Sequence, residues 1–178
     1  LSEHAFVHIE KIDVQPDSLT VVCEYNHLLL PNCDIFVTYV CDEADSVKVT
    51  VDYPGAPNQS DLPAFGLSFL LDASLKHVDY YGMGPMETYA DRCSGAVLGR
   101  YHYEVAENMV PYMKPQECGN RMGVRTLSVT DDAGAGVVVE AMDAPLEISV
   151  LPWTAEQIEA AGHYDELQGS CRTVLDIA

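Results

Sequence analysis

Apolar and polar residues alternate along most of the chain, as they do in strands that bury one face. The clearest run is VKVTVDY at residues 47–53, which ends at Pro54 and Gly55 because neither residue continues a paired strand well. The same alternation predicts strands near residues 7–9, 19–25, 35–41, 65–71, 75–81, 124–130, 137–141 and 146–151, and from residue 171 to the end. A polar loop between Pro54 and Pro63 and an Asp- and Gly-rich turn at residues 131–136 separate neighbouring strands.

A single helix is predicted after residue 153. Thr154 can cap its N-terminus, Gln157 stands three residues later as in a capping box, and Ile158 and Ala161 face the core. Many strands with one short helix favour an all-β antiparallel sandwich, because a parallel sheet needs a crossover helix between its strands. A chain of 178 residues can form one well-buried core, so we expect a single β-sandwich domain over residues 1–178.

The charge of the chain excludes some classes of partner. Twenty-eight acidic against nine basic residues give a formal net charge of -19, which repels nucleic acid and anionic membrane surfaces. No apolar run approaches the ~20 residues that cross a bilayer, so we expect no membrane partner. The six cysteines match neither a zinc knuckle nor a compact disulfide framework, so we expect buried thiols in a reducing, cytoplasmic compartment.

Three ordered motifs carry the information about function. Residues 80–92 (YYGMGPMETYADR) place two glycines and a proline before a dense polar cluster, and residues 111–121 (PYMKPQECGNR) form a second polar segment. Residues 146–167 join a strand, the capped helix and a closing HYDEL segment. We expect Gly82 and Gly84 to let the backbone bend or take positive φ. Together the motifs resemble the C-terminal domain of glycoside hydrolase family two β-galactosidases over roughly residues 62–167.

This resemblance implies a galactose-mutarotase-like β-supersandwich, taken from a parent enzyme that hydrolyses terminal non-reducing β-D-galactosides such as lactose. Such hydrolysis needs two carboxyl groups across the scissile bond, which the family carries in a barrel domain. A barrel of that kind needs ~250 residues with helices throughout, and nothing here resembles it. We therefore expect a non-catalytic fragment, beginning at Leu1 without a Met, that supports the assembly and the sugar site of its parent.

The resemblance also bears on partners and cofactors. The expected partners are the remaining domains of the parent, a β-galactoside bound through the full enzyme, and further subunits of a homo-oligomer. No cofactor is expected in this fragment, although the parent family often uses Mg or Na in other domains. One departure is Ala64, where the family usually carries an arginine, so no role of that arginine is carried over to this chain.

Residues of the first two motifs and the arginine that follows them are candidates for carbohydrate binding or interdomain contact, because arginine and carboxylate groups bind vicinal hydroxyls. These candidates are Glu87, Tyr89, Asp91, Arg92, Glu117, Asn120, Arg121 and Arg125. The alternative for Glu87 and Asp91 is an ion-paired structural knot with Arg92. Structural or interdomain pairing is also open for Glu117, Asn120, Arg121 and Arg125.

Two other functions are open. A mutarotase-like aldose 1-epimerase would use a histidine acid and a carboxylate base, such as His102 and Glu87. A carbohydrate-binding module would stack sugars on tyrosines near the motifs, although core packing explains these tyrosines equally well. Trp153 is expected to anchor the helix start. His77, His102 and His163 lack metal-ligand spacing, so no metal site is expected.

Overall fold

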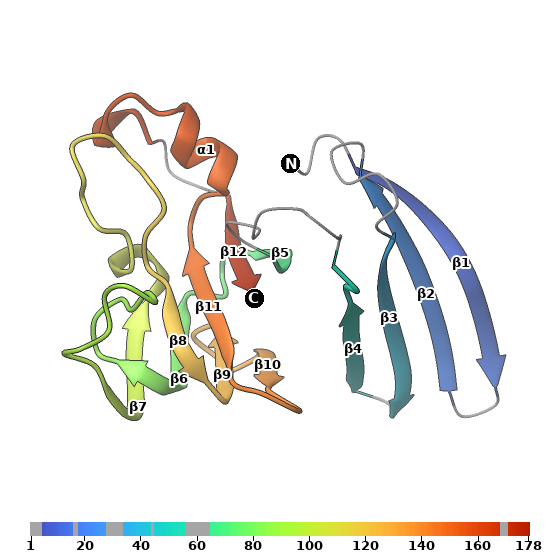
Figure 1. Ribbon diagram of the computed structural model, residues 1–178. Coiled ribbons are helices and arrows are strands. Elements are labelled where there is room, and N and C mark those ends of the chain that lie inside the picture. Colours follow the sequence, from blue (N-terminus) through green and yellow to red (C-terminus); the bar gives the residue numbers. More distant parts are fainter. Residues whose placement is uncertain (1–4, 16–17, 28–33, 44, 56–64, 168–170) are drawn as a thin grey trace. The chain divides into compact units, whose positions relative to one another are not determined.

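The computed structural model describes residues 5–15, 18–27, 34–43, 45–55, 65–167 and 171–178 (Figure 1). The chain forms two compact units, Leu1–Asp61 and Leu62–Ala178. All strand pairs within its sheets are antiparallel, and the described part contains one α-helix, α1 (Ala155–Ala160). The predicted all-β class is confirmed, whereas a single domain over residues 1–178 stays a prediction. Ala64 and most of the predicted loop before it lie outside the described residues.

The first unit contains one four-stranded antiparallel sheet in the order β1-β2-β3-β4. Its strands are β1 (Ala5–Gln15), β2 (Ser18–His27), β3 (Asp34–Glu43) and β4 (Ser46–Asp52). Each strand pairs with the next along the chain, as short connections between antiparallel strands favour.

A β-bulge in β1 keeps its apolar residues on one face of this sheet. The pairing with β2 shifts between Ile9 and Lys11, which leaves Glu10 as the extra residue. In the sequence, Ile9 and Ile12 are out of phase for strict alternation. The bulge corrects this phase, so Ile12 and Val14 share the face of Ile9.

The second unit contains two four-stranded antiparallel sheets. One has the order β10-β9-β6-β7, with strands β6 (His77–Gly84), β7 (Val97–Glu104), β9 (Thr126–Thr130) and β10 (Gly136–Glu140). The other has the order β5-β12-β11-β8, with strands β5 (Leu67–Asp72), β8 (Arg121–Val124), β11 (Leu146–Leu151) and β12 (Arg172–Ile177). Two short 3-10 turns are Val105–Glu107 and Tyr164–Glu166.

The chain changes sheets at Arg125, which corrects the prediction of one continuous strand over residues 124–130. Strand β8 ends at Val124 and pairs with β11, whereas β9 begins at Thr126 and pairs with β6. The backbone stays hydrogen-bonded at this point, because Arg125 N donates to Tyr81 O at 2.9 Å. Both strands bury residues in one core, but Val124 and Leu127 are three positions apart, so the alternation shifts phase where the chain changes sheets.

The core of the second unit lies between its two sheets. Each of the following side chains is at most 1% exposed: Val78, Leu127 and Val129 from one sheet, and Ile148, Val150 and Leu175 from the other. Two apolar faces packed in this way form a β-sandwich. Strand β7, which was not predicted, completes the sheet β10-β9-β6-β7, and the alternation of Tyr101 and Tyr103 with polar neighbours is its signal in the sequence.

Helix α1 begins as predicted. Thr154 is its N-cap, Thr154 Oγ1 accepts from Gln157 N at 3.3 Å, and Gln157 Oε1 accepts from Thr154 N at 2.9 Å. Ile158 and Ala161 are buried, and Trp153 packs beside Ile158 in a small apolar cluster, as expected of an anchor at the helix start. None of the described helices is long and apolar enough to span a bilayer.

The prediction of buried thiols is only partly correct. Cys118 is buried and two further cysteines are half-buried, but Cys93 and Cys171 are exposed. Both exposed thiols lie in connections outside the strands, where surface loops carry the chain. Cys33 lies outside the described residues.

Replacing Val129 with alanine should destabilise the protein by about 2–3 kcal/mol, because this valine is fully buried and its truncation leaves a cavity. Val138→Ala is the matched control, since Val138 is 67% exposed and its loss should cost less than about 0.5 kcal/mol. Urea unfolding followed by circular dichroism measures both. Equal losses from the two substitutions would contradict the assignment of the core.

Candidate functional site

The first motif folds around the carboxylate of Glu87, whose side chain is 9% exposed. Arg92 Nη2 donates to Glu87 Oε1 at 2.6 Å, and the Tyr112 hydroxyl donates to the same oxygen at 3.3 Å. Gly119 N donates to Glu87 Oε2 at 2.7 Å. The Arg92 guanidinium also lies 5.2 Å from the centre of the Tyr89 ring. The expected ion pair of Glu87 and Arg92 is confirmed, and both oxygens of Glu87 have partners.

Thr88 and Asn120 join the first motif to the second. Thr88 is 2% exposed; its N–H donates to Asn120 O at 2.8 Å, and its carbonyl accepts from Asn120 Nδ2 at 2.9 Å. Thr88 Oγ1 accepts from Met122 N at 2.8 Å, and Asn120 Nδ2 also donates to Glu147 at 2.9 Å. The amide of Asn120 is thus used within the fold.

Gly119 connects this contact to the interior. Its φ is +78°, and a Cβ at this position would lie 2.5 Å from Asn108 Nδ2, so only glycine fits without displacing a neighbour. While its N–H donates to Glu87, its carbonyl accepts from Asn108 Nδ2 at 3.0 Å and from Arg121 Nη1 at 3.1 Å. Gly119 therefore links the surface ion pair to a buried arginine.

The guanidinium of Arg121 is buried, with 6% of the residue exposed, and it has no carboxylate partner among the described residues. Arg121 Nε donates to the Tyr80 hydroxyl at 3.1 Å, and Nη2 donates to Asn108 Oδ1 at 2.9 Å. Nη1 donates to the carbonyls of Gly119 and Asn120, each at 3.1 Å. A buried cation needs such internal acceptors, because water no longer solvates it.

Two tyrosine rings complete the surroundings of Arg121. Its Cζ lies 5.1 Å from the centre of the Tyr103 ring and 5.9 Å from that of Tyr80, within the range of cation–π attraction. Burial raises the pKa of both phenols, which keeps them neutral beside the guanidinium. Tyr80 and Tyr103 are therefore part of the core and are not stacking faces for a sugar.

Gly82 and Gly84 do not take positive φ, which corrects that part of the expectation. Gly82 and Gly84 are regular residues of β6, and the bond from Gly84 to Pro85 is cis. A Cβ on Gly82 would lie 2.8 Å from Val124 Cγ2, and one on Gly84 would clash with the Tyr80 hydroxyl. Glycine is needed here for close packing between the strand and its neighbours.

An open depression lies beside the Glu87 ion pair. It is lined by Tyr89, Asp91, Arg92, Tyr112, Gln116 and Glu117. Asp91, Arg92 and Glu117 are exposed, and Asp91 takes no part in the ion pair of Glu87, contrary to the shared knot expected from the sequence. The hydroxyl of Tyr89 is buried without a hydrogen-bond partner in the described part of the chain, and burial raises its pKa.

Arg125 does not line this depression. Its Nη1 donates to Gly123 O at 2.7 Å, and its Cζ lies 5.7 Å from the centre of the Tyr81 ring. Arg100 Cζ lies 5.6 Å from the same ring, so two exposed arginines flank Tyr81. Among the candidates, Glu87, Asn120 and Arg121 therefore serve internal contacts. Asp91, Arg92 and Glu117 face the depression.

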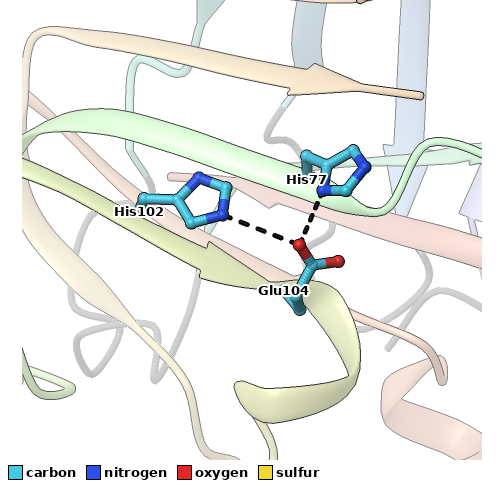
Figure 2. A group of neighbouring side chains, drawn as sticks. All are labelled: His77, His102 and Glu104. Atoms are coloured by element: carbon cyan, nitrogen blue, oxygen red, sulfur yellow. Dashed lines mark hydrogen bonds and ion pairs between the residues drawn. The ribbon is translucent and has the colours of Figure 1, made fainter. Parts of the chain in front are cut away.

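A second polar cluster lies on β6 and β7 and contains His77, His102 and Glu104 (Figure 2). His102 Nδ1 lies 3.2 Å from Asp79 Oδ1, and His102 Nε2 lies 3.6 Å from Glu104 Oε1. Both ring nitrogens of His102 thus face carboxylates other than Glu87. The structure does not bring together the histidine and glutamate that an epimerase would need.

Sequence reasoning missed two features of these sites. Asn108 bonds Gly119 and Val150, which are 11 and 42 positions away, and no local pattern signals such contacts. His77 and Glu104 are 27 positions apart and meet because their strands pair. The alternation of His102 and Glu104 on one strand was the only local sign of the second cluster.

Fold and site define a β-sandwich domain whose motif residues hold one another in place beside an open polar depression. Residues 3–178 match the family model described as the β-galactosidase small chain. The chain therefore belongs to the β-galactosidase small-chain family.

Relatives with known names agree with this family. The β-galactosidase of Lactobacillus delbrueckii subsp. bulgaricus is 43% identical over 155 residues, which are 87% of this chain and 15% of that protein. The β-galactosidase of Streptococcus thermophilus is 36% identical over 94% of this chain and 16% of its own length. The β-galactosidase small subunit of Latilactobacillus sakei is 31% identical over 89% of this chain and 52% of that subunit. The chain thus spans a small part of the first two proteins and about half of the third.

Replacing Arg121 with lysine should destabilise the protein by about 2–4 kcal/mol, because one ammonium group cannot reach the acceptors that the guanidinium fork reaches. Arg125→Lys is the matched control, since Arg125 is exposed, and its change should stay within about 0.5 kcal/mol. Urea unfolding measures both. A stable Arg121→Lys variant would show that the buried network is dispensable.

Proposed function

We propose that this chain is the C-terminal β-sandwich domain of a cytoplasmic glycoside hydrolase family two β-galactosidase and does not itself catalyse hydrolysis. The parent hydrolyses terminal non-reducing β-D-galactosides such as lactose, with both catalytic carboxyl groups in another domain. The Mg or Na of the family belongs to those other domains as well. The names of the relatives and the three motifs support this proposal.

The pairing of Glu87 is the observation that supports a non-catalytic role. A retaining glycosidase needs one ionised carboxylate free to attack the sugar and a second carboxyl group about 5 Å away. The side chain of Glu87 is 9% exposed, and its two oxygens accept from Arg92, Tyr112 and Gly119. A carboxylate held in this way is stabilised as a structural anion and is a poor nucleophile.

The open depression is the part of the second unit that suits contact with a sugar or with a neighbouring domain. Asp91, Arg92 and Glu117 present two carboxylates and a guanidinium to solvent, which are the groups that hydrogen-bond hydroxyls. The buried hydroxyl of Tyr89 lies in the same lining. The site is shallow, so the chain shapes a sugar site completed by other domains of the parent.

The apolar face of the first unit supports a role in assembly. Ile9, Ile12 and Val14 lie on one face of the sheet and are each more than 50% exposed, and Val47 on β4 is 55% exposed. The described part of this unit contains one sheet and no second layer. Apolar sheet faces are stable when they are buried against another layer. Its partner in this proposal is the remainder of the parent, which assembles as a homo-oligomer.

The purified chain should release chromophore from a nitrophenyl β-galactoside no faster than buffer does, because the enclosed carboxylate of Glu87 already has partners at both oxygens. The parent enzyme, assayed in parallel, is the positive control. Hydrolysis that scales with the concentration of the chain and disappears in Glu87→Gln would overturn the non-catalytic assignment.

Ligand-observed NMR with galactose and lactose separates an accessory domain from a carbohydrate-binding module. We expect no saturation transfer from the folded chain to either sugar at millimolar concentration, because the depression is open and incomplete. Transfer that is lost in Asp91→Asn or Glu117→Gln, but kept in the distant control Glu140→Gln, would establish binding by this chain alone.

A further inference from the structure

Two histidines and a glutamate meet on the outer face of the sheet β10-β9-β6-β7 (Figure 2). His77 and Asp79 lie on β6, and His102 and Glu104 lie on β7. His77 is paired directly with Glu104, and Asp79 with His102. Because directly opposed residues of antiparallel strands share a face, the register alone brings these four side chains together.

One nitrogen of each imidazole faces the same carboxylate oxygen. His77 Nδ1 lies 2.6 Å from Glu104 Oε1, and His102 Nε2 lies 3.6 Å from it. One ligand atom from each of the three residues lies within 4.8 Å of the others. Ligands of tetrahedral zinc, at bond lengths of ~2.0–2.1 Å, lie about 3.3 Å from one another. Small side-chain rotations would bring the three atoms to that spacing.

The second nitrogen of each imidazole also faces a carboxylate. His77 Nε2 lies 2.8 Å from Asp132 Oδ1, and His102 Nδ1 lies 3.2 Å from Asp79 Oδ1. This arrangement is the one that metal-bound histidines show, because the outer carboxylate accepts the remaining N–H and fixes the tautomer that binds the ion. It is an observation independent of the convergence on Glu104.

A structured turn holds Asp132 in position. Asp131 Oδ1 accepts from the backbone N–H groups of Ala133 and Ala135, at 2.8 and 2.9 Å. Lys76 Nζ contacts the other oxygen of Asp132 at 3.0 Å. The outer carboxylate of His77 is thus fixed by contacts that do not involve the histidine.

We propose that His77, His102 and Glu104 bind a divalent transition-metal ion of the zinc type, with Asp132 and Asp79 orienting the two imidazoles. Two imidazoles and one carboxylate suit zinc, whereas Mg²⁺ and Ca²⁺ prefer oxygen ligands alone. Three protein ligands leave a further position for water. The side chains of His77 and Glu104 are 27% and 34% exposed, so the ion has access from solvent.

A bound ion would connect β6 to β7, and through Asp132 to the turn before β10. Without metal, hydrogen bonds to Asp132 and Glu104 raise the pKa of His77. The metal must therefore displace a proton from this imidazole. Titration at pH 8 reduces that competition.

Calorimetric titration of the chelator-treated chain with ZnCl2 at pH 8 tests the proposal. We expect one zinc ion per chain, with the affinity reduced at least tenfold in His102→Ala and about tenfold in Asp79→Asn. His163→Ala is the matched control, since this exposed histidine lies outside the cluster and its loss should leave the affinity unchanged. Zinc should also raise the melting temperature of the wild-type chain more than that of His102→Ala.

Cobalt gives a second readout that does not depend on stability. Substitution with Co²⁺ should produce visible absorption bands of a four-coordinate site in the wild-type chain and in His163→Ala, but not in His102→Ala. Absence of zinc binding in the folded wild-type chain would overturn the proposal. Equal affinity in wild type, His102→Ala and Asp79→Asn would also overturn it, since zinc would then bind elsewhere. The result does not depend on whether the parent hydrolyses galactosides.

Discussion

The guanidinium of Arg121 is a charge in the interior, and it must be satisfied by groups that the fold itself supplies. Those groups are two backbone carbonyls, the Asn108 side chain and the Tyr80 hydroxyl, with two tyrosine rings beside them. They come from β6, β7, the turn after β7 and the segment that leads into β8. If one of them moved, a buried cation would lose a partner, at a cost of several kcal/mol. The arginine therefore fixes the end of the second motif at Gly119 and Asn120.

The position of that motif decides what happens at the surface. Because the carbonyl of Gly119 is held by Arg121 and Asn108, its N–H points to the carboxylate of Glu87. Glu87 in turn orients Arg92 and Tyr112 at the edge of the open depression. A residue in the core thus determines which polar groups remain at the surface for a sugar or a neighbouring domain. This hierarchy agrees with the proposed role as an accessory domain, because the motif builds a surface.

The histidine cluster on β6 and β7 arises from a different constraint, namely strand register. Its members are half-exposed, and they meet because two antiparallel strands pair His77 with Glu104 and Asp79 with His102. A shift of the register by one residue would move each set to the opposite face of the sheet. The core side chains Val78 and Tyr80, which alternate with His77 and Asp79, hold that register in place.

Features that depend on neighbouring residues were predictable from the sequence. Alternation predicted the all-β class and most strands, and the capping box of Thr154 and Gln157 predicted the start of α1, because both signals lie within a few residues. The ion pair of Glu87 with Arg92 could also be predicted, because the two residues are five positions apart. The change of sheets at Arg125 and the close packing at Gly82 and Gly84 became clear only from the three-dimensional fold. The burial of Arg121 and the position of His77 beside His102 also depend on the three-dimensional fold. These features depend on contacts between strands far apart in the chain, and local patterns do not specify which strands pair or in what register.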